Sequence, residues 1–193
     1  MIQAPMGETT VLLHTCCAPC SSAIIEAMMK NGITPVIYYC NPNIYPQAEY
    51  EIRKDECTRY AESLGLEIID ADYDHDNWLE TIRGLEDEPE RGGRCLRCFR
   101  MRLLRTAEYA AQRGIKVITT TLASSRWKSL DQINEAGQWA CNEAGRRFID
   151  APVWWTQNWR KGGLQERRLQ IIKEYDFYNQ QYCGCEFSMR NKD

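Results

Sequence analysis

Short apolar runs that resemble buried strands alternate with helical segments along most of the chain, and this alternation constrains the fold more than any other feature. The apolar runs cover residues 10–16, 33–40, 66–73 and 115–122. Strands that alternate with helices predict a parallel sheet with helices on both faces. We therefore expect a single-domain α/β fold of the Rossmann-like or HUP-like type over residues 1–193.

The helical segments and a fifth strand complete this prediction. Glycines at the ends of two segments, Gly32 and Gly65, are typical of helix termini. We expect helices over residues 21–32, 45–65, 76–85, 94–114, 129–145 and 162–181, and a possible fifth strand over residues 146–153.

The charge balance and the N-terminus narrow the class of protein. The chain has 24 basic and 27 acidic residues, a net charge of -3, so any binding to a nucleic acid must come from a local basic patch. No basic segment followed by an apolar run opens the chain, and no run approaches the length of a membrane span. We expect a cytoplasmic protein that binds neither membranes nor DNA.

Ten cysteines are present, and most of them cluster. In a cytoplasmic chain of this length, reduced thiols that bind metal or exchange electrons are favoured over a disulfide framework. Cys40, Cys57 and Cys141 are isolated and are expected to be small buried apolar residues. The other seven fall into three groups: Cys16, Cys17 and Cys20; Cys95 and Cys98; Cys183 and Cys185.

The predicted fold indicates where a site would lie. In open α/β sheets, ligands bind beyond the carboxyl ends of the strands. Cys16 and Cys17 follow the first predicted strand, and Asn41 and Asn43 follow the second. We therefore expect these residues at one rim, with the asparagines as candidate substrate-binding groups.

Three chemistries suit the first cysteine group. Cys17 and Cys20 have the spacing of a thioredoxin-type redox pair that opens a helix, although such a pair leaves the other cysteines without a role. Two such pairs would also make a closed zinc site, which normally supports a smaller fold than this one. In the third interpretation, the adjacent thiolates of Cys16 and Cys17 bind an iron-sulfur cluster at a helix N-terminus. The residue pattern alone leaves all three open.

A basic stretch surrounds the second cysteine group. Residues 91–105 contain six arginines and no acidic residue. Helical projection places Arg94, Arg97 and Arg105 opposite an apolar face formed by Leu96, Phe99, Leu103, Ala107 and Ala110. A solvated face is one explanation, but a cationic strip beside a metal site favours a polyanionic substrate such as RNA.

The third group is the closely spaced Cys183-Gly184-Cys185. A disulfide between these cysteines would be local, somewhat strained and easily reduced. The pair either stores two electrons or binds one iron.

Five segments of the chain are distinctive as a set: LLHTCCAPCSS, YYCNPNIYPQAEYEIR, RGGRCLRCFRMRLLRTAEYA, TTLASSRWKSLDQINEAG and YCGCEFS. Together they resemble the QueH family, the cobalamin-independent epoxyqueuosine reductases of bacterial queuosine biosynthesis. The resemblance implies a 4Fe-4S enzyme that removes the epoxide oxygen from epoxyqueuosine at the wobble position of tRNA, the last step in making queuosine.

The resemblance also implies roles for individual residues. Cys20 matches a position that can hold a second, mononuclear iron, and Cys183 and Cys185 match the redox-active pair. Ser125-Arg126 departs from the Ser-Pro expected there and is expected to alter only the shape of a loop. The cluster ligands implied are Cys16, Cys17, Cys95 and Cys98.

The implied reaction needs two electrons, two protons and a Lewis acid. Asp72, Tyr73 and His14 are candidate proton donors because they lie in or directly after predicted strands. The implied partners are a tRNA with epoxyqueuosine in its anticodon loop and an unidentified electron donor, and a segment of about residues 161–193 is expected to close the site. The alternatives are a non-catalytic zinc or iron-sulfur RNA-binding module and a thioredoxin-like thiol oxidoreductase.

Overall fold

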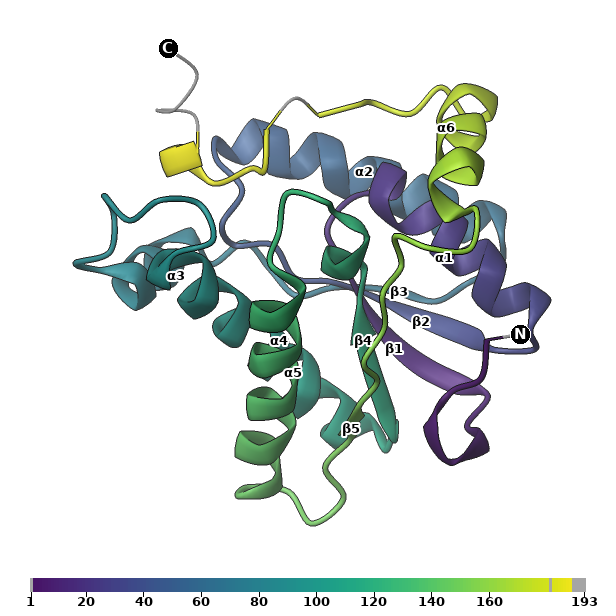
Figure 1. The fold of residues 1–193 in the computed structure, drawn as a ribbon, viewed down its shortest axis with the longest axis horizontal. Helices are drawn as coiled ribbons and strands as arrows, with labels where there is room; N and C mark the ends of the chain where they lie inside the picture. Colours follow the sequence, from purple (N-terminus) through teal and green to yellow (C-terminus); the bar gives the residue numbers. More distant parts are fainter. Residues whose placement is uncertain (1, 181, 189–193) are drawn as a thin grey trace.

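Five parallel strands form one sheet in the computed structural model, which describes residues 2–180 and 182–188 (Figure 1). The strand order is β3-β2-β1-β4-β5. This arrangement confirms the predicted parallel α/β fold. The strands are β1 (Thr10–Thr15), β2 (Thr34–Tyr39), β3 (Ile68–Asp70), β4 (Val117–Thr120) and β5 (Val153–Trp154).

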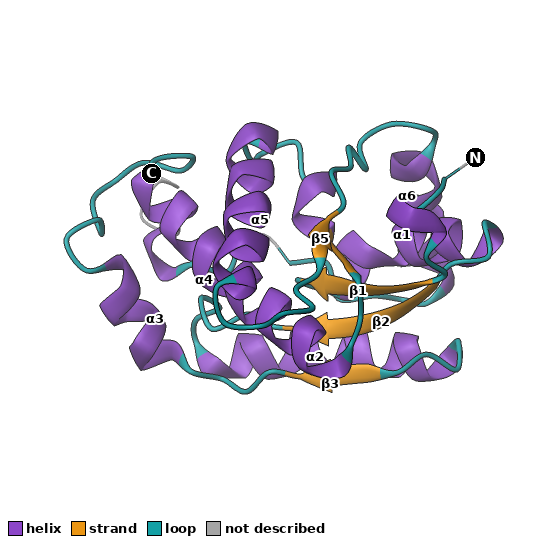
Figure 2. Cartoon of the chain, turned by 90° about the horizontal axis from the view of Figure 1, so that it is seen from below, coloured by secondary structure: helices purple, strands orange, loops and turns teal. Residues whose placement is uncertain are grey.

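Helices cover both faces of the sheet (Figures 1 and 2). Helices α1, α2 and α6 lie on one face, α4 and α5 lie on the other, and α3 lies against α4. None of the described helices is long and apolar enough to cross a membrane. Their bounds are α1 (Ala18–Lys30), α2 (Gln47–Ser63), α3 (His75–Ile82), α4 (Gly93–Arg113), α5 (Leu130–Gly145) and α6 (Leu164–Glu174); the short 3-10 helices are η1 (Pro5–Gly7), η2 (Thr121–Ser124) and η3 (Glu186–Ser188).

The central strand β1 pairs with β2 on one side and with β4 on the other. Residues 11–15 of β1 and all of β4 are buried, as expected for strands covered on both faces. The chain builds β2 and β3 on one side of β1 and then crosses to build β4 and β5 on the other. Because strand order reverses there, the carboxyl ends of β1 and β4 border the crevice where ligands bind in such sheets.

Helix α4 buries the apolar face that its sequence predicts. Phe99, Leu103, Ala107 and Ala110 are buried, and Leu96 is half-buried. The isolated cysteines are buried too, as predicted; they are Cys40, Cys57 and Cys141.

The strand expected over residues 66–73 is confined to β3, and the strand expected over residues 115–122 ends at Thr120, where η2 begins. Two other predicted elements differ further from the structure. The strand expected over residues 146–153 is confined to Val153 and Trp154, because the amides of Arg147 and Phe148 donate back to the carbonyl of Ala144 and extend the end of α5. The last helix, expected over residues 162–181, ends at Glu174 within the described residues, and residue 181 lies outside them.

Close packing between α5 and β5 generates a prediction. A Cβ at Gly137 would overlap the indole ring of Trp154. We expect Gly137→Ala to lower the free energy of unfolding by about 1–3 kcal/mol, because the ring must move. Urea denaturation measures this change.

Gly145 at the end of the same helix provides the matched control. An added Cβ there would lie 3.7 Å from the Cβ of Ala151, an ordinary contact. We expect Gly145→Ala to raise the free energy of unfolding by about 0.4–1 kcal/mol, because alanine restricts the unfolded chain. Equal stability of the two variants would contradict the packing argument.

Candidate functional site

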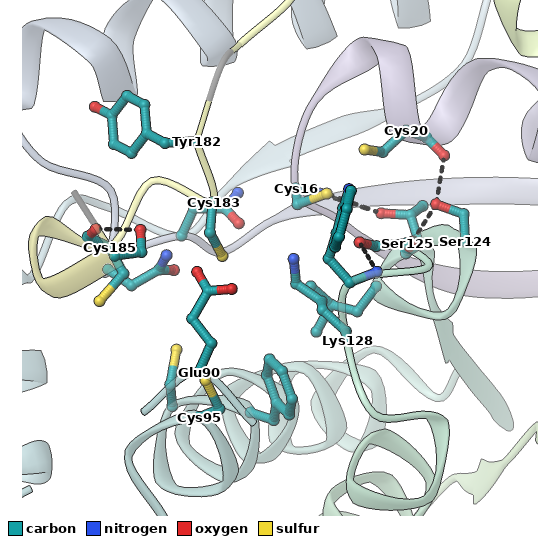
Figure 3. A pocket seen from close by; sticks show the side chains of 18 of the residues that line it. Cys16, Cys20, Glu90, Cys95, Ser124, Ser125, Lys128, Tyr182, Cys183 and Cys185 are labelled. Carbon is teal, nitrogen blue, oxygen red and sulfur yellow. Dashed lines mark hydrogen bonds between the residues drawn. The ribbon is translucent and has the colours of Figure 1, made fainter. Parts of the chain in front are cut away.

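A cavity of about 820 Å³ opens where the carboxyl ends of β1 and β4 meet. Three distant parts of the chain form its wall: the turn after β1, the first turns of α4, and the segment after α6 (Figure 3). This is the position that the strand order predicts for a ligand. Six cysteines from the three predicted groups line it: Cys16, Cys20, Cys95, Cys98, Cys183 and Cys185.

Cys16, Cys17 and Cys20 form a compact group of thiols at the junction of β1 and α1. Their Sγ atoms all lie within 4.8 Å of one another, and those of Cys16 and Cys17 are 3.9 Å apart. Cys17 is the residue before α1, and the first turn of that helix carries Cys20 back beside it. The backbone N–H of Cys16 donates to the Thr121 hydroxyl at 3.3 Å, which ties this turn to the end of β4.

The three thiols differ in acidity. Hydrogen bonds from Cys17 and Cys20 hold the pKa of the Cys16 thiol well below its usual value. Burial raises the pKa of Cys17, and the hydrogen bond with Cys16 is the main cause that raises the pKa of Cys20 to about 12. Because a thiolate is the form that binds metal, a buried group containing one is suited to a metal ion.

Cys95 and Cys98 reach the cavity from α4, and Figure 3 shows Cys95 across the cavity from Cys16 and Cys20. The α4 pair is not part of the compact group, the only such group among the described residues. The backbone N–H of Arg91 donates to the sulfur of Cys95 at 3.3 Å. Burial raises the pKa of Cys95 to about 11. The two sets of thiols therefore face one another across the cavity.

The segment after α6 brings Cys183 and Cys185 to the same cavity. Cys183 is exposed, whereas Cys185 is buried and has its pKa raised to about 12 by that burial. The buried guanidinium of Arg53 donates to the carbonyl of Cys183 at 3.3 Å and forms an ion pair with Glu49. Gly184 has a φ of 107°, and a Cβ there would lie 2.9 Å from Ile44, so only glycine suits the position.

Arg102 is a buried arginine that lines the cavity, and our sequence analysis did not single it out. Arg102 donates to the carbonyl of Cys40 at 3.0 Å, to the side-chain oxygen of Asn41, and to the sulfur of Cys98 at 3.9 Å. Asn41 in turn donates to the carbonyl of Thr15 at 2.9 Å. The position of Arg102 in the sequence offered one signal of this contact, because Arg102 follows Cys98 by one helical turn.

The candidate proton donors lie outside the residues that line the cavity. His14 is fully buried; its Nε2 donates to the Cys40 carbonyl and its Nδ1 accepts from the Thr120 hydroxyl. Burial lowers the pKa of His14 to about 3, so the ring is neutral. The Tyr73 hydroxyl donates to a backbone carbonyl, and Asp72 is exposed. Their role in proton transfer stays a prediction.

The three arginines of the predicted strip differ in burial and in their contacts. Arg94 is buried rather than solvated, because its guanidinium donates to the carbonyl of Glu86 at 2.6 Å and lies over the ring of Phe187. Arg105 is half-buried and donates to a backbone carbonyl, and Arg97 is exposed. Only Arg94 of the three lines the cavity, and substrate binding by the strip stays a prediction.

The cavity has a strong excess of positive charge. Among the described residues that line it, Glu90 is the only carboxylate. Asn43, predicted from sequence, also lines it, and its buried Oδ1 has no hydrogen-bond partner. Of the basic residues of this wall, only Arg94 was predicted from the sequence to bind substrate. The basic side chains are Arg53, Arg91, Arg94, Arg102, Arg126, Lys128, Arg160 and Arg168.

Comparison with known proteins gives consistent matches over nearly the whole chain. The family model for "Epoxyqueuosine reductase QueH" matches residues 11–191. The chain is 48% identical over 190 residues to the protein of that name from Histophilus somni, covering 98% of this chain and 76% of the relative. It is 46% identical over 192 residues to the one from Haemophilus influenzae, covering 100% and 76%. It is 45% identical over 190 residues to the one from Acinetobacter baylyi, covering 98% and 85%.

The compact thiol group generates a metal-binding prediction. We expect Cys16→Ser to weaken the binding of Co²⁺ by at least about tenfold, because the most acidic sulfur of the group is removed. Cobalt per chain and thiolate-to-cobalt absorption under anaerobic conditions measure the effect. Cys57→Ser, which removes a buried thiol outside the cavity, is the control and should leave both unchanged. Equal cobalt binding by the two variants would remove Cys16 from the site.

Proposed function

The chain belongs to the QueH family of epoxyqueuosine reductases, and we propose that it reduces epoxyqueuosine at the wobble position of tRNA to queuosine. The family match carries this conclusion. The reaction removes the epoxide oxygen as water and takes up two electrons and two protons. The convergence of six cysteines on one cavity supports a redox reaction there, because thiols and thiolate-bound metals can both supply electrons.

We propose Cys16, Cys17, Cys95 and Cys98 as the ligands of a 4Fe-4S cluster. Such a cluster supplies electrons one at a time when it is bound. Each of the four sulfurs accepts a hydrogen bond, as ligand sulfurs commonly do. The donors are the Thr121 hydroxyl for Cys16, the Gln180 amide for Cys17, the Arg91 backbone N–H for Cys95 and the Arg102 guanidinium for Cys98.

Cys20 is left as the ligand of a second, mononuclear iron in this proposal. Its sulfur lines the cavity and lies within 4.8 Å of the sulfurs of Cys16 and Cys17. A further metal so near the cluster ligands would be held close to any substrate that enters the cavity.

Cys183 and Cys185 form the proposed redox pair. Oxidation of the two thiols to a disulfide releases two electrons and two protons, which is what the deoxygenation consumes. The exposure of Cys183 supports regeneration, because a cellular dithiol can reach it and reduce the disulfide by exchange. The class of the electron donor in this proposal is therefore a dithiol.

The proposed substrate enters as an unpaired nucleotide of the anticodon loop. RNA bases are accessible mainly in single-stranded loops, and enzymes that act on a base take it out of the stack. The cavity volume lies within the range of small-molecule sites. Its basic wall favours the phosphates of RNA, and Trp127, 65% exposed at the cavity wall, offers a ring on which a base can stack.

A direct assay tests the function. Anaerobically reconstituted protein, a dithiol reductant and tRNA carrying epoxyqueuosine should yield queuosine on mass analysis of the nucleosides. Cys98→Ser should lose bound iron and product together, whereas Cys141→Ser, a buried thiol outside the cavity, should retain both. Absence of queuosine from the wild-type reaction would refute the proposed function.

The role of the C-terminal pair leads to a separate prediction. We expect Cys183→Ser to keep most of its bound iron yet lose multiple-turnover activity, because the disulfide between residues 183 and 185 can no longer form. Iron per chain and product per enzyme are measured on the same sample. Loss of iron in proportion to activity would instead make Cys183 a metal ligand, and full activity would exclude both roles.

A further inference from the structure

One basic side chain of the cavity has a fixed backbone but no hydrogen-bond or ion-pair partner within residues 2–180 and 182–188. Lys128 lies in the loop between η2 and α5, and Figure 3 shows its side chain directed into the cavity. Its ammonium makes no hydrogen bond or salt bridge with any residue that the structure describes. The lysine is half-buried, so water solvates this charge less than it would at the surface.

The neighbouring arginines of the cavity differ from Lys128 in this respect. Six of them donate hydrogen bonds to oxygen atoms of the chain itself, and the seventh, Arg126, is exposed and lies over the ring of Trp127. These six guanidinium groups therefore already use hydrogen-bond donors within the protein. The six are Arg53, Arg91, Arg94, Arg102, Arg160 and Arg168.

The backbone that carries Lys128 is held from two sides. Arg91 donates to the carbonyls of Trp127 at 2.9 Å and Arg126 at 3.2 Å. Arg160 donates to the carbonyl of Lys128 itself at 2.8 Å. Three bonds from guanidinium groups thus fix the loop, so that the lysine side chain starts from a defined point on the cavity wall.

The ammonium lies between the groups of sulfur atoms. Burial by itself would lower the pKa of Lys128, but its electrostatic interactions with Cys183, Cys16 and Cys20 raise it above its usual value. The ammonium of Lys128 therefore interacts electrostatically with both the compact thiol group and the C-terminal pair. A substrate in the space between these groups would lie on the side of the cavity into which Lys128 is directed.

We propose that the Lys128 ammonium is a catalytic group that hydrogen-bonds the epoxide oxygen and stabilises negative charge on it as its C–O bonds break. This inference rests on the proposed function. In the complete step, two C–O bonds break and a C=C bond forms. The dithiol of Cys183 and Cys185 is oxidised to a disulfide and supplies two electrons and two protons, and the oxygen leaves as water.

The proposal predicts selective binding, which can be measured without turnover. Queuosine lacks the epoxide oxygen, so a charge-assisted hydrogen bond from Lys128 should make oxidised wild-type protein bind tRNA carrying epoxyqueuosine more tightly than tRNA carrying queuosine. A single bond of this kind corresponds to a ratio of at least about tenfold. Lys128→Met should reduce the ratio to about one.

Kinetics and a matched control complete the experiment. Lys128→Met should lower the single-turnover rate by about 10²-fold or more, as loss of a donor to a developing oxyanion does, with iron content and thermal midpoint unchanged. Lys161→Met removes an exposed lysine outside the cavity and should alter neither rate nor binding ratio. Should Lys128→Met lower the thermal midpoint, Lys128→Gln serves for the same comparison.

The outcomes separate this inference from the function on which it rests. A binding ratio or single-turnover rate in the Lys128 variant equal to that of wild type, or loss of activity explained by loss of iron, would overturn the role of Lys128 while leaving the reductase assignment intact. Failure of the wild-type protein to form queuosine would overturn both.

Discussion

The buried guanidinium of Arg102 connects the sheet to the helix that carries the second pair of cysteines. It bonds the chain just after β2 through Cys40 and Asn41, and it reaches Cys98 on its own helix. A buried cation is costly unless it is hydrogen-bonded and its charge is balanced. No carboxylate contacts Arg102 among the described residues, and its acceptors are two oxygen atoms and the sulfur of Cys98. The contacts of Arg102 therefore join α4 to the residues that follow β2.

The strand order makes such a connection possible. Because β1 lies between β2 and β4, the turn that carries Cys16 lies beside the start of η2, where Thr121 contacts it. Helix α4 crosses from the β3 edge of the sheet to β4 and brings Cys95 to the same end. The segment after α6 adds the last two cysteines to the wall of the cavity. Three cysteine groups far apart in sequence therefore meet because parallel strands all end at one edge.

Sequence patterns predicted those parts of the structure that depend on local periodicity. The pattern of apolar residues along the sequence predicted the buried strands and the buried face of α4. The three groups of cysteines predicted the residues that line the cavity. The parts not foreseen depend on distant partners. Arg94 is buried because Phe187, more than ninety residues later, covers its guanidinium. No role was predicted for Lys128, because the direction of its side chain into the cavity depends on the distant residues that hold its loop.

Arg91 contacts both a sulfur atom and the edge of the cavity. Its backbone N–H bonds Cys95, and its side chain bonds the carbonyls of Arg126 and Trp127. Hydrogen bonds shorten and strengthen when the acceptor is charged. Ionisation of the Cys95 sulfur would therefore strengthen its bond with the residue that also holds the carbonyls of Arg126 and Trp127. The charge on Cys95 and the position of the neighbouring loop are thus linked through Arg91.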